Sequence, residues 1–132
     1  MKKVFFMSRH NAKQHKFDPN NDCLISINDT EGHKQEMLDT HDYMGNNILA
    51  LVFSDIPYFD DSAISDNQVE DVFNFIESQR KKKNFYVHCL FGVSRSAAVA
   101  KYIGEYFLID NVFLEEYDMH NIFVYKKLTE FQ

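Results

Sequence analysis

A cysteine and an arginine, Cys89 and Arg95, stand six positions apart in the segment YVHCLFGVSRS, which spans residues 86–96. A thiol with an ordinary pKa of about 8.5 is mostly protonated at neutral pH. Backbone N–H donors and a nearby guanidinium favour the thiolate, which is the nucleophilic form. The planar guanidinium can also bind two oxygens of one phosphate group. The spacing therefore predicts a site that combines a nucleophile with an anion-binding group.

The residues between Cys89 and Arg95 favour a phosphate-binding loop. Backbone N–H groups of such a loop can point inward at an oxyanion, and a helix that follows adds the unsatisfied N–H groups of its first turn. A glycine allows the backbone to turn tightly. Besides Arg95, we expect phosphate contacts from Leu90, Phe91, Gly92, Val93 and Ser94.

Two neighbours of the loop are expected to support the nucleophile. The hydroxyl of Ser96 can donate a hydrogen bond to the sulfur of Cys89 and so ease the departure of the thiolate in a second chemical step. His88 is better explained as a residue that fixes the loop by hydrogen bonding than as a general base.

The arrangement His88-Cys89-x5-Arg95-Ser96 resembles the H-C-x5-R-S/T signature of cysteine-based protein phosphatases. The run HCLFGVSRSAA looks most like the compact dual-specificity branch of the protein-tyrosine-phosphatase superfamily. The resemblance implies a phosphomonoester hydrolase for phosphotyrosine, with phosphoserine and phosphothreonine as further candidates, that works through a phosphocysteine intermediate. It implies a phosphorylated protein or peptide as partner, and neither a metal nor another cofactor.

The resemblance also implies a general acid and a supporting asparagine. Members of this branch carry an aspartate on a loop upstream of the cysteine, and here Asp55 precedes Cys89 by 34 positions. Asp60 and Asp61 lie on the same acidic loop, which spans residues 54–64, and remain alternatives for the role of general acid. The segment NIFVYKKL is similar to the closing helix of the family, whose leading asparagine, here Asn121, supports the phosphate loop.

Other interpretations of the loop stay open. A phosphatase for an inositol phosphate or an RNA 5′ phosphate would use the same nucleophile, but the apolar residues Leu90, Phe91 and Val93 favour an aromatic or peptide substrate over a polyphosphate. A catalytically weak phosphate-binding module would keep the loop without turnover. A rhodanese-like or arsenate-reducing protein also uses a cysteine loop, but the upstream acid and the run SRS at 94–96 disfavour it.

The elements that must position these residues alternate between strands and helices. Short apolar runs predict strands at residues 4–7, 23–27, 48–53 and 85–88. Nearly continuous apolar strands between helices are typical of a sheet that is covered on both faces. We therefore predict an α/β fold with a small, mostly parallel sheet of about four to five strands. The resemblance makes this fold protein-tyrosine-phosphatase-like.

The helices are predicted from caps and periodicity. Ser65 and Gln68 match a capping box, and the helix that follows is expected to end in the basic run 80–83, where cations suit the negative helix terminus. Residues 28–47 are expected to be polar and irregular. Further helices are expected at 94–108 and within 113–131, with one helical turn at 11–16.

Length and charge limit the classes of protein to which the chain can belong. The chain has 132 residues, of which 45% are hydrophobic and 15% aromatic, which predicts a single folded domain over 1–132. A net charge of −6 disfavours general binding to nucleic acid or to an anionic membrane. The longest apolar run is far shorter than the roughly 20 residues of a membrane helix. We expect a cytoplasmic protein, and the sequence is silent on its oligomeric state.

The other candidate residues have ordinary explanations. Cys23 is expected to be a buried strand residue, with a resolving thiol for oxidised Cys89 as the alternative. Both thiols are expected to be reduced, because two cysteines do not make a disulfide framework. The basic run 80–83 is expected to be a solvated helix end rather than a docking patch. The scattered histidines lack metal-ligand spacing; they are His10, His15, His33, His41 and His120.

Overall fold

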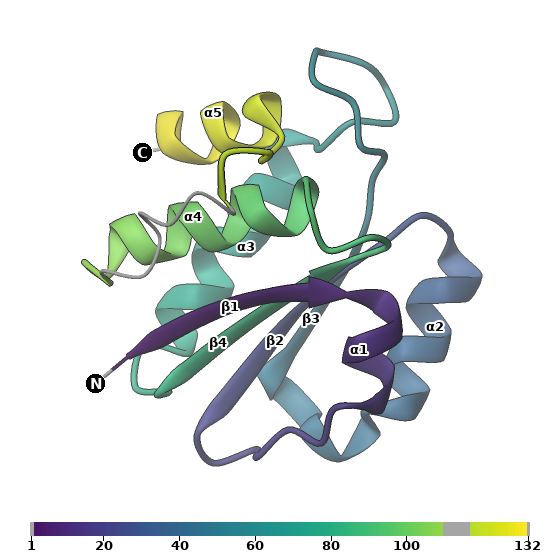
Figure 1. The fold of residues 1–132 in the computed structure, drawn as a ribbon, viewed down its shortest axis with the longest axis vertical. Coiled ribbons are helices and arrows are strands. Elements are labelled where there is room, and N and C mark those ends of the chain that lie inside the picture. Colours follow the sequence, from purple (N-terminus) through teal and green to yellow (C-terminus); the bar gives the residue numbers. More distant parts are fainter. Residues whose placement is uncertain (1, 110–116, 132) are drawn as a thin grey trace.

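A four-stranded parallel sheet forms the centre of the molecule (Figure 1). The computed structural model describes residues 2–109 and 117–131. The strands lie in the order β1-β4-β2-β3, and every neighbouring pair is parallel. The predicted α/β fold and its four strands are confirmed, and the sheet is parallel throughout the described residues. The strands are β1 (Lys3–Ser8), β2 (Asp22–Asn28), β3 (Ile48–Val52) and β4 (Asn84–Cys89).

β2 and β4 form the middle of the sheet. Every residue of β2 is buried, as expected for a parallel strand with helices on both faces. In the register, His88 lies beside Met7 of β1 and Ser26 of β2. Parallel pairing thus brings the carboxyl ends of the strands to one edge, which is the edge at which open α/β sheets bind ligands.

Helices cover both faces of the sheet (Figure 1). Strand side chains alternate between the two faces: Ile25 joins the larger apolar core, and Leu24 joins a smaller cluster on the opposite face. On the side of the larger core lie α3 (Asp66–Ser78), α4 (Arg95–Tyr106) and α5 (Ile122–Glu130), and on the other side lie α1 (Arg9–Gln14) and α2 (Glu31–Thr40).

α3 begins as the sequence predicts. The Oγ of Ser65 accepts a hydrogen bond from the N–H of Gln68 at 3.1 Å, and the side chain of Gln68 accepts one from the N–H of Ser65 at 3.0 Å. The helix ends at Ser78, so the basic run 80–83 lies in the turn that follows. The prediction that these cations stabilise the last turn of the helix is therefore wrong.

Residues 28–47 are more regular than predicted. They contain α2 and a short 3₁₀ helix over Asp42–Asn47. The hydroxyl of Thr30 caps α2 by accepting a hydrogen bond from the N–H of His33 at 3.0 Å. Met37 is the residue that α2 buries, so the helix lacks the repeated apolar positions that reveal an amphipathic helix in a sequence. The prediction of an irregular segment is wrong for this reason.

The remaining helices agree with the predictions. α4 confirms the helix expected at 94–108, and α1 begins two residues before the helical turn expected at 11–16. α5 lies within the span 113–131, of which residues 113–116 are outside the described residues. None of the helices in the described ranges is both long and apolar enough to cross a membrane.

Candidate active site

The loop that is predicted to bind phosphate, residues 90–94 between β4 and α4, is called the phosphate loop below. It turns tightly against the end of β1. Gly92 has a φ of 70°, a conformation that favours glycine. A Cβ atom at this position would overlap the backbone of Met7 and Ser8. The N–H of Arg9 donates a hydrogen bond to the carbonyl oxygen of Leu90 at 3.2 Å. The end of β1 therefore fixes the course of the loop.

Cys89 is buried at the start of this loop, and its thiol is surrounded by hydrogen-bond donors. Its Sγ lies 3.1 Å from the Oγ of Ser96. Burial raises the pKa of the thiol, but the hydroxyl of Ser96 and the backbone N–H groups of Ser96, Gly92 and Val93 together outweigh burial. The pKa of Cys89 is lowered from its ordinary value as a result. The protein thus stabilises the thiolate relative to an ordinary cysteine, which is the direction that a nucleophilic role would need.

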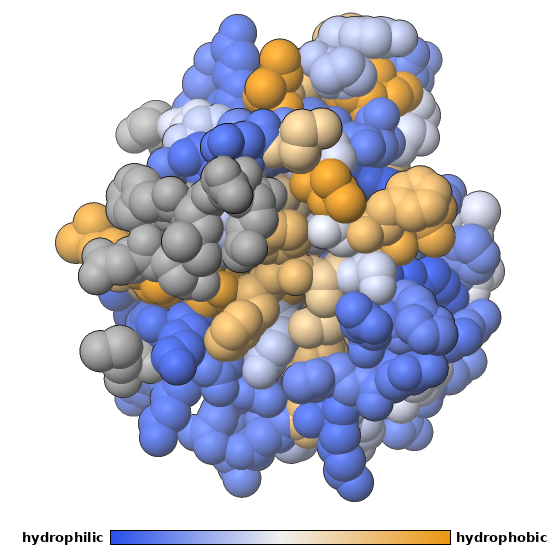
Figure 2. Space-filling model, viewed as in Figure 1, coloured by the Kyte–Doolittle hydropathy of each residue, from blue (hydrophilic) through white to orange (hydrophobic). Residues whose placement is uncertain are grey.

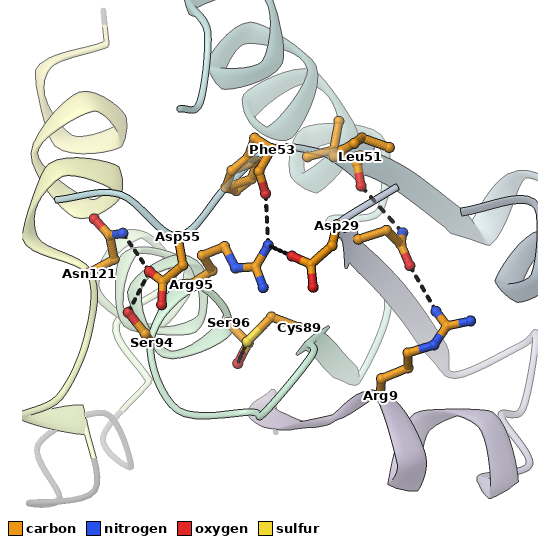
Figure 3. A network of polar contacts seen from close by, with 12 residues as sticks. Arg9, Asp29, Leu51, Phe53, Asp55, Cys89, Ser94, Arg95, Ser96 and Asn121 are labelled. Carbon is orange, nitrogen blue, oxygen red and sulfur yellow. Dashed lines mark hydrogen bonds and ion pairs between the residues drawn. The ribbon is translucent and has the colours of Figure 1, made fainter. Parts of the chain in front are cut away.

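Arg95 forms hydrogen bonds through one nitrogen of its guanidinium, Nη1 (Figure 3). Its side chain is 4% exposed, and Nη1 donates to Oδ1 of Asp29 and to the carbonyl oxygen of Phe53, each at 2.7 Å. Nε is buried and has no acceptor among the described residues. The edge formed by Nε and Nη2 is the one that remains for two oxygens of a bound oxyanion.

Asp55 and Asn121 meet at the phosphate loop (Figure 3). Oδ1 of Asp55 accepts hydrogen bonds from Oγ of Ser94 at 2.8 Å and from Nδ2 of Asn121 at 2.7 Å. The backbone N–H of Asn121 donates to the carbonyl oxygen of Ser94 at 3.0 Å. Oδ1 of Asn121 also caps α5 by accepting from the N–H of Val124 at 3.0 Å. One asparagine therefore joins the helix, the phosphate loop and the acidic loop.

Asp60 and Asp61 lie further along the acidic loop and face different groups. Oδ1 of Asp60 accepts hydrogen bonds from the N–H and the hydroxyl of Ser62, at 2.9 and 2.8 Å. These bonds hold the pKa of Asp60 below its ordinary value, which disfavours the protonated form that a general acid needs. Asp61 borders a surface hollow beside Asp29. Within the described structure, Asp55 is the one of the three whose carboxylate bonds the phosphate loop.

His88 is fully buried next to the nucleophile. Its Nε2 lies 2.6 Å from Oγ of Ser26 on β2, and burial lowers the pKa of His88 to about 4. The imidazole is therefore neutral at neutral pH. Nδ2 of Asn28 donates to the same Oγ at 3.0 Å, so Ser26 connects His88 to Asn28. The contact with Ser26 holds the imidazole of His88 against β2, and the role of His88 in fixing the loop stays a prediction.

The polar contacts continue from β2 to Arg9 (Figure 3), and from Arg9 to α2. Oδ1 of Asn28 accepts a hydrogen bond from Nη1 of Arg9 at 3.1 Å. The same Nη1 donates to the carbonyl oxygen of His33 at 3.2 Å, and Nη2 of Arg9 lies 3.2 Å from Oε1 of Glu36. A continuous set of polar contacts thus connects β4, which carries Cys89, through β2 to α2.

Four residues that support the site were not predicted from the sequence. They share one property, which is that they lie at or near the carboxyl ends of β1 and β2. Parallel pairing places these ends beside Cys89, so polar residues at the ends of predicted strands were the available signal. The four residues are Arg9, Ser26, Asn28 and Asp29.

Cys23 does not lie near the nucleophile. It pairs with Phe85, four positions before Cys89 on β4, and four residues of strand span roughly 13 Å. Cys23 is buried, burial raises the pKa of its thiol, and both cysteines are free. The expected buried strand residue is confirmed, and the resolving-thiol alternative is wrong. In residues 2–109 and 117–131, no three His, Cys, Asp or Glu side chains gather as metal ligands would.

The structure brings the predicted site residues together at the carboxyl edge of the sheet. Cys89 and Ser96 bond to each other, and Asp55 and Asn121 bond to Ser94 and to each other. Comparison of the chain with protein-family models, with curated proteins and with solved structures finds no match. The function is therefore inferred from these residues, their geometry and the resemblance of the loop sequence.

Proposed function

We propose that this protein is a cysteine-dependent phosphatase of the compact dual-specificity kind, with a protein-tyrosine-phosphatase-like fold. Its substrate is a phosphorylated protein or peptide that carries phosphotyrosine, with phosphoserine and phosphothreonine as further substrates. The observation that carries the proposal is Cys89, a buried thiol whose pKa is nevertheless lowered by the loop N–H groups and by Ser96. Arg95, held at Nη1 with Nε unbonded, supports it.

In the first step, the thiolate of Cys89 attacks phosphorus in line with the leaving oxygen. The S–P bond forms while the P–O ester bond breaks, and protonated Asp55 gives its proton to the leaving oxygen. Nε and Nη2 of Arg95 and the N–H groups of the phosphate loop stabilise the charge on the three other oxygens. The step yields a free phenol or alcohol and phosphocysteine.

In the second step, Asp55, now a carboxylate, accepts a proton from the water molecule that attacks phosphocysteine. A new P–O bond forms while the S–P bond breaks, and inorganic phosphate is released. The hydroxyl of Ser96, 3.1 Å from Sγ, stabilises the departing thiolate. Ser94 and Asn121 hold Asp55 beside the loop through Oδ1, which leaves Oδ2 for the proton transfers. The mechanism requires a reduced thiol, and so a reducing compartment such as the cytoplasm.

The proposal is tested with the purified full chain and para-nitrophenyl phosphate. Turnover is expected in the presence of EDTA, because the proposed steps use only side chains of the protein. Cys89→Ser is expected to lower turnover by about 10⁴-fold or more and to keep binding of a phosphotyrosine peptide. Cys23→Ala is the matched control, because it removes the other thiol at a distance from the site and should leave turnover in place.

Two results would contradict the proposal. Binding of phosphate by the wild-type chain without turnover of any ester would identify a phosphate-binding module. Turnover confined to inositol phosphates or RNA 5′ phosphates, with phosphopeptides untouched, would identify a phosphatase for a non-protein substrate.

A further inference from the structure

Six apolar side chains stand exposed around the candidate active site. They come from the three segments that meet there, which are the acidic loop 54–64, the phosphate loop and residues 117–122, which end at the first residue of α5. Phe59 is 81% exposed and Phe91 is 78% exposed. A cluster of large exposed apolar residues, unlike a single one, marks an interaction site. We call this set the apolar rim; it consists of Tyr58, Phe59, Phe91, Val93, Met119 and Ile122.

The bonds of the site hold together the three segments that carry the apolar rim. Phe91 and Val93 belong to the phosphate loop itself. Asp55, near the start of the loop that carries Phe59, bonds to the phosphate loop, and the residue before Ile122 bonds to Asp55. In Figure 2, orange side chains are spread over the upper part of the face, where Figure 1 places the acidic loop, the start of α5 and the loop after β4.

Every charged residue of the three segments is an aspartate. Residues 54–64, 90–94 and 117–122 contain no lysine or arginine. Such a surface repels an anionic membrane and offers no further cation for a polyphosphate or a nucleic-acid backbone. It is complementary to a ligand that is apolar and cationic around its phosphate group. The acidic residues of the three segments are Asp55, Asp60, Asp61 and Asp118.

We propose that the apolar rim binds the stretch of a substrate protein on either side of its phosphotyrosine, and that it selects apolar and cationic residues there over acidic ones. The inference rests on the proposed phosphatase function. The phosphate group occupies the phosphate loop while the flanking side chains lie on the rim. Burial of one aromatic side chain changes affinity by roughly tenfold or more, and Asp60 and Asp61 oppose an acidic flank.

The test compares three phosphotyrosine peptides of equal length whose flanks are apolar and cationic, neutral and polar, or acidic. Binding is measured with the Cys89→Ser chain and kcat/KM with the wild-type chain. The apolar and cationic peptide is expected to exceed the acidic peptide by about tenfold in both measurements. Phe59→Ser is expected to remove most of this preference and to leave the hydrolysis of para-nitrophenyl phosphate unchanged.

Leu108→Ser is the matched control. Leu108 is 87% exposed beyond the far end of α4, about 20 Å along the helix from the phosphate loop, so its replacement should leave the peptide preference in place. Equal binding of the three peptides would overturn the inference. So would Phe59-dependent binding to vesicles of anionic phospholipid without a peptide preference. Failure to hydrolyse para-nitrophenyl phosphate would overturn the proposed function instead, and the order of peptide binding would still decide the role of the rim.

Discussion

Two loops meet at the carboxyl edge of the sheet, and the surrounding structure holds them in different ways. The phosphate loop is fixed at its start, middle and end. Leu90 is bonded by the backbone of Arg9, Gly92 packs against the end of β1, and Ser94 is bonded by the backbone of Asn121. The acidic loop 54–64 is mostly exposed, and several of its hydrogen bonds are internal, such as the one between the N–H of Ser54 and the carbonyl oxygen of Ser62 at 2.7 Å.

In the proposed mechanism, this difference separates two chemical tasks. Binding the phosphate group and activating the nucleophile need hydrogen-bond donors that are in place before substrate arrives, since preorganised donors need no rearrangement during reaction. Proton transfer needs an acid that is held near the loop and still open to water, and Asp55 satisfies this through the bonds to one of its oxygens. Changes in the phosphate loop should therefore affect every substrate, and changes in the acidic loop should affect substrates selectively.

After Cys89→Ser, Arg95→Lys should have the largest effect on activity. Lysine keeps the positive charge but loses the planar fork and the paired bonds to Asp29 and Phe53. We expect kcat/KM to fall by about 10³-fold for every phosphate ester. Arg80→Lys, on the exposed turn after α3, is the control and should leave kcat/KM unchanged. A loss below about tenfold for Arg95→Lys would show that the fork of the guanidinium is not used.

Gly92→Ala tests whether the phosphate loop is fixed by its packing on β1. Gly45→Ala is the matched control, because Gly45 also has a positive φ, of 54°, but open space where its Cβ would lie. We expect urea unfolding to show a loss of about 2–4 kcal/mol for Gly92→Ala and about 1–2 kcal/mol for Gly45→Ala. Turnover should fall only for Gly92→Ala. Equal losses of stability for the two variants would mean that the contact with Met7 and Ser8 does not restrain the loop.

Asp55→Asn should show the selectivity expected of the acidic loop. Asparagine can still accept hydrogen bonds from Ser94 and Asn121 but cannot deliver the proton. We expect kcat/KM to fall by about 10²-fold for phenyl phosphate and much less for para-nitrophenyl phosphate, whose leaving group needs little help. Kinetics on a series of aryl phosphates measures this dependence as the slope of log kcat/KM against the pKa of the leaving phenol. If Asp61→Asn produces the slope and Asp55→Asn does not, Asp61 is the general acid.

Ser96→Ala should have the smallest effect, and a distinct one. The hydroxyl of Ser96 stabilises the thiolate, so its removal raises the pKa of Cys89 towards the ordinary thiol range. At a given pH below that pKa less thiolate is present, and the pH profile of alkylation by iodoacetamide moves to higher pH. The release of the thiolate in the second step should slow by about tenfold. Ser78→Ala on α3 is the control, and an unmoved alkylation profile for Ser96→Ala would exclude this role.

The sequence was sufficient for the parts of the structure that depend on local pattern. Four apolar runs revealed the four strands, and the capping box at Ser65 revealed the start of α3. The spacing of Cys89 and Arg95 predicted a loop between a strand and a helix, and the structure contains that loop between β4 and α4. Phosphate binding by this loop stays a prediction, based on the anion site that such a loop can form from local residues.

Contacts between distant segments were harder to predict. The bond between Arg95 and Asp29 joins residues 66 positions apart, and the bond between Asp55 and Asn121 spans the same separation. Neither partner has a local pattern that reveals the pair, since each contact depends on the order of strands in the sheet. α2 was missed for a related reason, because its stability comes from the cap at Thr30 and one buried Met37 rather than from an apolar stripe.

The pairing of β1 with β4 determines when the thiol becomes reactive during the life of the chain. Lys3 pairs with Asn84, 81 positions away, and pairings between such distant segments tend to form late in folding. The phosphate loop takes its shape only when Gly92 can pack on the end of β1. A nascent or unfolded chain therefore carries Cys89 as an ordinary thiol, with little tendency to react. The thiol of Cys89 therefore becomes more reactive towards oxidants and electrophiles only after the sheet is complete. Chains that are still folding are protected from these reagents.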